Sequence, residues 1–373
     1  MMQSSPPASP FLMDFGPLSC HCTNAALEGL YKAMADPPAE EADAWIWLPH
    51  QNPWISEHIE NITARGNRIL SRIQDELESV TNINSPQLKK ADDPWTPPSA
   101  AALEQLRLQL NAIPADRKSI DDWMRVVDYV IQRYLAADVI KNEADYITVR
   151  AVLLAKLQAA AEQGRHTPPD TRQMSVLLAA LPSNFHALPR DLTPRELNIL
   201  QFSAQETANH ITDLAQQVRS SVKSTLLNGI RAMSMGEPDG TWNKLQQQLF
   251  DQFGTYNRDW RRIAITETGN ATNAGFISSL AVGTKVRRLE AYRGACPFCA
   301  SIAGRVLTIV SEDKSPKDWD HEVWPTKNNI GRSASPRKRV GNVLVARTDE
   351  ELWKIPAGLV HPHCRGGWSI AER

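Results

Sequence analysis

Two short pairs of potential metal ligands place the strongest constraint on how the C-terminal part of this chain can fold. The sequence reads C-P-F-C at positions 296–299 and H-P-H-C at positions 361–364. Each pair is short enough to turn both donors toward one ion, and the long segment between the pairs can bring them together, as in a tetrahedral zinc site. The sequence therefore predicts a structural zinc held by Cys296, Cys299, His361 and Cys364, with no coordination position left for water or substrate.

Two alternatives to this ligand set remain open. His363 lies on the same predicted turn as His361 and is an equivalent candidate ligand. The same residues can also be thiols and a surface histidine that hold no metal. A redox CxxC is disfavoured because no βαβ pattern surrounds it. The five cysteines form an odd set, and the N-terminus lacks the pattern of a secretory signal, so we expect reduced thiols in a bacterial cytoplasm.

Helical periodicity dominates the chain before residue 283. Apolar residues from Ile55 to Val80 recur at helical spacing, Ser119 begins another helix as its N-cap, and a further helix covers roughly residues 143 to 164. Thr193-Pro194-Arg195-Glu196 combines an N-cap, a first-turn proline and a capping-box glutamate. The helices that follow are expected to end near Gly236, at Gly254 and at Gly283.

Strand-like segments appear only after this helical region. We expect strands at 285–292, 305–310, 340–346 and 367–370. The predicted fold is therefore mainly α, with a helical N-terminal and central region followed by a small α+β module stapled by zinc. The expected divisions are a Pro-rich arm over 1–52, a helical domain over 53–190, and a third domain over 191–373, with its helices at 194–282 and its Cys/His module at 284–373. The arm is either disordered or ordered on a partner.

A run of basic residues interrupts the C-terminal module. No acidic residue occurs between Glu322 and Asp349, whereas this stretch contains Lys327, Arg332, Arg337, Lys338, Arg339 and Arg347. Such a run is either a solvated loop or a contact for DNA phosphates or an acidic protein surface. Pro325, Pro336 and Gly341 predict an irregular backbone here. The net charge of −1 gives the whole chain no field that would steer it toward nucleic acid.

Motifs of several enzyme classes and of membrane proteins are missing from the sequence. It has no Walker A, G-x-S-x-G or G-x-G-x-x-G motif, and the residues around Cys296 lack the H-x-E and P-C-x-x-C of zinc deaminases. No apolar run approaches the roughly 18 residues that span a bilayer. We therefore expect no catalytic activity, no small-molecule substrate and no membrane contact.

The C-terminal half resembles the phage minor head, or head-morphogenesis, family, also called Mu F-like. The resemblance covers roughly residues 195 to 370 and rests on linked pieces in a fixed order. They are R-I-A-I-T-E-T at 262–268, N-A-G at 273–275, C-P-F-C at 296–299, G-R-V at 304–306 and H-P-H-C-R at 361–365. The sequence departs from the family at Ile265, where the box usually has Arg, and at Gly366, which replaces a final Cys. Gly294-Ala295 replaces a common acidic residue, and the segment 319–346 is longer than usual.

The resemblance implies a structural protein of the virion, present in few copies and made in the host cytoplasm. Its expected location is the portal region or the capsid interior, and its expected partners are the portal protein and capsid or scaffold proteins. Phage DNA is a further expected partner, through Lys327, Arg332, Arg337, Lys338 and Arg339. The alternative is a DNA-binding protein that uses the zinc module and the basic run without a role in the head.

Overall fold

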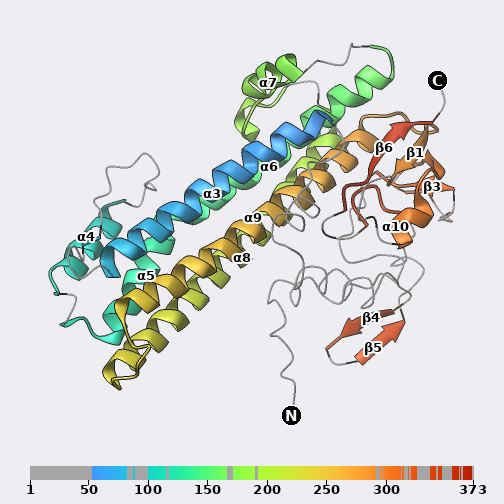
Figure 1. Cartoon of the computed structure of the whole chain (residues 1–373). Helices are drawn as coiled ribbons and strands as arrows, with labels where there is room; N and C mark the ends of the chain where they lie inside the picture. Colours follow the sequence, from blue (N-terminus) through green and yellow to red (C-terminus); the bar gives the residue numbers. More distant parts are fainter. Residues whose placement is uncertain are drawn as a thin grey trace. The chain divides into compact units, whose positions relative to one another are not determined.

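The computed structural model describes the chain from Pro53 onward, with gaps. The described residues are 53–81, 87–88, 100–114, 117–165, 171–189, 192–290, 295, 297–311, 313–314, 318, 321–325, 337–341, 343–346, 355–360, 362 and 364–371. They are mainly helical, with a small mixed sheet near the C-terminus (Figure 1), which confirms the predicted fold class at this level. The expected arm over 1–52 lies outside the described residues. None of the described helices has the length and apolar character needed to cross a membrane.

The chain forms two compact units that do not follow sequence order. One, which we call the sheet unit, comprises Met1–Glu60, Ile147–Ser203 and Ala264–Arg373. The other, the helical unit, comprises Asn61–Tyr146 and Ala204–Ile263. All four boundaries between them fall inside helices: α3 (Pro53–Thr81), α6 (Ala137–Glu162), α8 (Pro194–Ser234) and α9 (Trp242–Ser278). The predicted domain bounds, which follow sequence order, stay a prediction.

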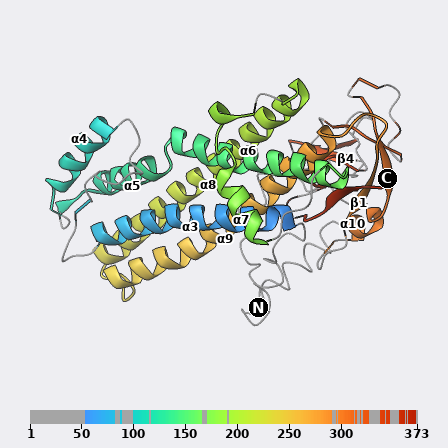
Figure 2. The same ribbon diagram turned by 90° about the horizontal axis from the view of Figure 1, so that it is seen from above.

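The helical unit adds α4 (Ala100–Asn111) and α5 (Ile120–Tyr134), which lie next to each other in both views (Figures 1 and 2). Helix α5 begins as predicted. The Ser119 hydroxyl accepts a hydrogen bond from the Asp122 backbone N–H, and the Asp122 carboxylate accepts one from the Ser119 backbone N–H. Such a capping box satisfies backbone donors that an uncapped helix end would leave exposed.

Two buried contacts fasten the helices of this unit. The Glu76 carboxylate accepts hydrogen bonds from Arg133 Nη1, at 2.8 and 2.9 Å, and from the Tyr134 hydroxyl at 2.7 Å. The Trp260 indole N–H donates to the Ile62 carbonyl at 2.9 Å. This close approach requires glycine at position 66, because a Cβ there would lie 1.8 Å from Trp260 Nε1.

The sheet unit contains the α7 helix (Thr171–Ala180), the η3 turn (Phe185–Ala187) and the start of α8. The α8 capping box forms as predicted, since Thr193 and Glu196 bond each other's backbone N–H groups. Glu196 also does more than cap. Its buried carboxylate accepts a hydrogen bond from the Ser279 hydroxyl and pairs with Lys156 at 3.4 Å, so it ties α6 and the end of α9 to α8.

A four-stranded mixed sheet with the order β3-β2-β1-β6 completes this unit. Its strands are β1 (Lys285–Leu289), β2 (Val306–Ile309), β3 (Glu322–Val323) and β6 (Gly367–Ile370). Strand β1 pairs antiparallel with β2 and β6, and β2 pairs parallel with β3. One backbone donor of the edge strand β6 is satisfied by a side chain, because Glu162 accepts the Ile370 backbone N–H at 2.7 Å.

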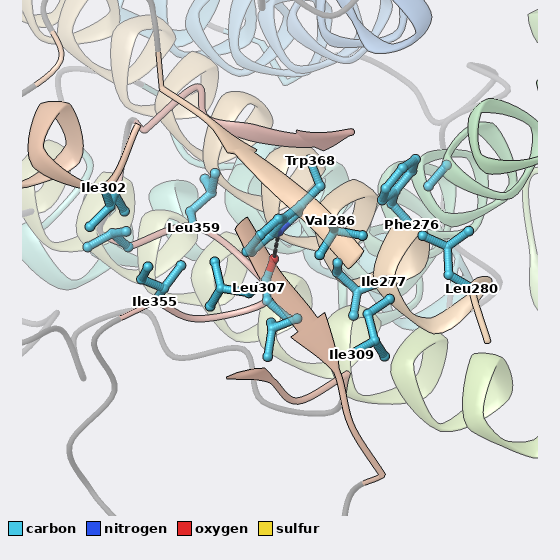
Figure 3. Close-up of a cluster of buried hydrophobic side chains, with 14 of the residues drawn as sticks. Phe276, Ile277, Leu280, Val286, Ile302, Leu307, Ile309, Ile355, Leu359 and Trp368 are labelled. Atoms are coloured by element: carbon cyan, nitrogen blue, oxygen red, sulfur yellow. Dashed lines mark hydrogen bonds between the residues drawn. The ribbon is translucent and has the colours of Figure 1, made fainter. Parts of the chain in front are cut away.

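The inner face of the sheet packs on an apolar cluster (Figure 3) that includes the end of α9 and the short helix α10 (Pro297–Ile302). The labelled side chains of this cluster are Phe276, Ile277, Leu280, Val286, Ile302, Leu307, Ile309, Ile355, Leu359 and Trp368. Within it, the Trp368 indole N–H donates to the Ala357 carbonyl at 2.7 Å.

Three sequence-based expectations were wrong. Gly254 does not end a helix, because α9 runs unbroken from Trp242 to Ser278. A single helical glycine costs only about 1 kcal/mol, and the buried neighbours Phe253 and Tyr256 outweigh that cost. The expected strand over 340–346 is instead a hairpin of β4 (Arg337–Val340) and β5 (Val343–Ala346). Its turn begins at Gly341, whose φ of 60° suits glycine far better than other residues. The basic run therefore has regular structure over Arg337–Arg339, where irregular backbone was expected.

Candidate metal centre

Two of the four predicted metal ligands meet in the sheet unit. Cys299 lies on α10 and Cys364 lies just before β6, and their Sγ atoms are 3.4 Å apart. Both side chains are buried, with exposed fractions of 0% and 1%. The separation is far longer than the roughly 2.05 Å of a disulfide bond. Two thiolates bound to one tetrahedral zinc at about 2.3 Å would lie roughly 3.8 Å apart, so a small shift would let both sulfurs hold the same ion.

The local structure explains why these two thiols meet. Proline suits the first position of α10, where it has no backbone N–H to leave unsatisfied. The segment that carries Cys364 is held on α9 from both sides. Asn270 Oδ1 accepts the Leu359 backbone N–H at 3.0 Å, and Asn273 Nδ2 donates to the Gly366 carbonyl at 2.8 Å. These bonds position the chain before and after Cys364 against one face of α9.

A bound cation would compensate the charge of the thiol pair if the thiols ionise. Cys299 and Cys364 belong to the same buried cluster as the apolar side chains of the sheet core. Burying charge in such a place is costly unless a counter-charge or hydrogen bonds compensate it. A metal ion supplies that compensation directly, because coordinated thiols are deprotonated. Thiolate sulfur is a donor that zinc prefers, so the two described thiols are compatible with zinc.

The other predicted ligands cannot be placed. Cys296, His361 and the alternative His363 lie outside the described residues. Among the residues that the structure does describe, no group of three or more His, Cys, Asp and Glu side chains is positioned to hold a metal. The four-ligand set thus stays a prediction. Of the predicted DNA-contacting residues, Lys327 and Arg332 also lie outside the described part, whereas Arg337, Lys338 and Arg339 form most of β4.

A buried ion pair lies in the same module as the thiols and was missed from the sequence. Arg288 and Glu290 are 0% and 1% exposed, and Arg288 Nε donates to Glu290 Oε1 at 2.7 Å. Arg288 Nη1 also donates to the Gly358 carbonyl at 3.0 Å, and its guanidinium lies over the Trp368 ring, 5.0 Å from the centroid. These contacts join β1 to β6 and to the segment before Cys364.

Gly366 packs against the Glu290 carboxylate of this ion pair. A Cβ at this position would lie 2.2 Å from Glu290 Oε1, so no larger residue fits without moving the carboxylate. The sequence carried one usable signal for the ion pair. In a strand, alternate residues share a face, so once Val286 is assigned inward, residues 288 and 290 must also point inward. The partners on residues 358 and 368 could not be read from that alternation.

No protein-family model matches this sequence, and no curated protein or solved structure matches it either. Arguments about function therefore depend on the residues and the geometry described above.

Proposed function

We propose that the chain is a phage minor head protein, a structural component of the virion that acts in head morphogenesis at the portal. The observation that carries this proposal is the spatial arrangement of the motifs on which the family resemblance rests. Thr266 and Glu267 of the R-I-A-I-T-E-T motif are buried on α9. Asn270 and Asn273, on the same helix, bind the chain on both sides of Cys364. Residues 264–268 and 273–275 of these motifs thus belong to the same folded unit as Cys299 and Cys364.

The proposed function needs a rigid module, and the proposed metal contributes to that rigidity. Cys296, Cys299, His361 or His363, and Cys364 would hold a structural zinc, which would supply a cross-link between α10 and the chain before β6. Around it, Asn270, Asn273 and the Arg288–Glu290 pair keep the loop segments on α9 and β1. No catalytic step is proposed for these residues.

Association with the portal is the property that separates this proposal from the DNA-binding alternative. We expect the full-length chain, co-expressed with the portal protein of the same phage, to co-purify with it, and to be found by mass spectrometry in procapsids. DNA binding without portal binding or incorporation would contradict the proposal and favour the alternative.

A matched pair of variants links the module to assembly. Cys299→Ser should remove a ligand and loosen the module, so the variant should be depleted from procapsids. Ala300→Ser is the control, because it places the same hydroxyl on an exposed position of α10. Equal incorporation of both variants at wild-type level would show that this module does not carry the association.

A further inference from the structure

The β4–β5 hairpin combines an isolated pair of strands with exposed apolar residues at its turn. In the described part of the chain, β4 and β5 pair only with each other. Val340 and Val343, which flank the turn, are 56% and 63% exposed. An isolated two-stranded hairpin is at best marginally stable in water, and apolar side chains at its tip gain nothing from solvent. Both facts favour a binding partner for the hairpin.

The charges of the hairpin indicate what that partner is. Strand β4 carries Arg337, Lys338 and Arg339 in succession, within a stretch that has no acidic residue from position 323 to 348. Successive strand residues lie on opposite faces, so positions 337 and 339 share one face of the ribbon and position 338 belongs to the other. A flat acidic surface would meet only one face. A groove of duplex DNA presents phosphates on both sides, and the major groove admits a two-stranded ribbon.

We propose that β4 and β5 form a DNA-binding ribbon that enters a groove of double-stranded DNA. The three basic residues of β4 contact phosphates on the two sides of the groove, and Val340 and Val343 contact sugars and thymine methyl groups. This inference rests on the proposed function only for the source of the DNA, since a head protein lies beside the packaged genome. The ribbon itself is argued from the register and charge of β4 and β5 alone.

The test measures binding of the full-length protein to a short DNA duplex by fluorescence anisotropy at increasing salt. Each neutralised phosphate contributes about −0.9 to the slope of log K against log salt. Replacing Arg337, Lys338 and Arg339 together by Gln should therefore make the slope shallower by about 2.7. Over a fourfold rise in salt the wild-type protein should lose about 40-fold more affinity than this variant.

Two further variants distinguish DNA binding by the β4–β5 ribbon from a nonspecific effect of positive charge elsewhere on the protein. Replacing Lys285, Arg287 and Arg305 by Gln removes the same charge from exposed positions at β1 and beside β2, and should leave the slope unchanged. Gly341→Val keeps every cation but strains a turn that needs a φ of 60°, and should lower affinity toward that of the β4 variant. Circular dichroism should show that all variants keep their helical content.

Three results would overturn the inference. They are a wild-type slope in the β4 variant, an equal loss in the charge-matched control, and wild-type affinity in Gly341→Val. Binding to anionic lipid vesicles without binding to DNA would overturn it as well. Failure here leaves portal association untouched, and failure of portal association leaves solution DNA binding untouched, so the two proposals fail separately.

Discussion

The two units bury ion pairs of similar quality in very different settings. In the helical unit, Glu76 on α3 binds Arg133 and Tyr134 at the end of α5, and both helices satisfy their own backbone hydrogen bonds. In the sheet unit, Arg288 and Glu290 lie two residues apart on a five-residue strand and bind short loop segments. The long helices hold their conformation partly through their own backbone hydrogen bonds, whereas the short strand and the loop segments have fewer such bonds of their own. The comparison indicates that a cross-link such as a metal ion or a buried ion pair matters most where the secondary-structure elements are short.

The largest difference between the units should appear when the proposed zinc is removed. Structural zinc contributes apparent binding energies of about 10–16 kcal/mol in zinc-finger peptides, and chelation should transfer much of that cost to the C-terminal module. We expect hydrogen exchange to show lost protection at β1, β6 and α10 after chelation, while α5 and the α9 segment around Trp260 keep theirs. Equal loss in both units, or no loss in either, would contradict the comparison.

In the helical unit, Glu76→Ala should have the largest effect of a single substitution. It leaves Arg133, which is 2% exposed, as a buried charge whose carboxylate partner is gone. Removing one partner of a buried ion pair typically costs about 3–5 kcal/mol. Asp128→Asn is the control, because its pairs with Arg219 and Lys223 involve a carboxylate that is 42% exposed, and exposed pairs are worth about 0–1 kcal/mol. Urea denaturation of both variants measures the difference.

Gly366→Ala is the corresponding test in the sheet unit. The added Cβ would lie 2.2 Å from Glu290 Oε1, so the substitution must displace the buried carboxylate or the chain after Cys364. Overpacking costs about 1–3 kcal/mol, and we expect a loss near the upper end because Arg288 loses alignment as well. Thermal unfolding combined with local hydrogen exchange should place the loss at β1 and β6. A stability equal to wild type would show that this core is more plastic than its contacts indicate.

Two glycines in helices of the helical unit provide the test with the smallest expected changes in stability. Gly66→Ala should destabilise it by about 1–3 kcal/mol, since the methyl group would overlap the Trp260 indole that binds the Ile62 carbonyl. Gly254→Ala meets nothing within 4 Å and should stabilise α9 by about 0.5–1 kcal/mol. Both changes in stability are measured from the midpoint of urea unfolding. The same sign for both substitutions would contradict the packing described for Gly66.

Local signals were predictable from the sequence, and contacts between distant segments were not. The capping boxes at Ser119 and Thr193 were predicted correctly because each depends on residues three positions apart. The effect of Gly254 was misjudged because burial of its helical neighbours overrides the local propensity. The hairpin was predicted as one strand although Gly341-Asn342 between Val340 and Val343 is a residue pair typical of a two-residue hairpin turn.

Contacts between distant segments of the candidate metal site could likewise be predicted only in part. The pairing of C-P-F-C with H-P-H-C predicted a meeting of distant cysteines, and Cys299 and Cys364 do lie 3.4 Å apart. The roles of Asn270, Asn273 and Gly366 could not have been predicted, because their partners lie from 76 to 93 residues away in the sequence and their position depends on the whole fold.

Zinc content tests the central claim, that a metal held by Cys299 and Cys364 joins the ends of the C-terminal module. Full-length protein purified without an affinity tag should contain about one equivalent of zinc per chain by elemental analysis. The Cys299→Ser and Cys364→Ser variants should each lose most of it, while the exposed control Ala300→Ser keeps it. Wild-type protein with less than about a tenth of an equivalent, after purification without chelators, would contradict the account.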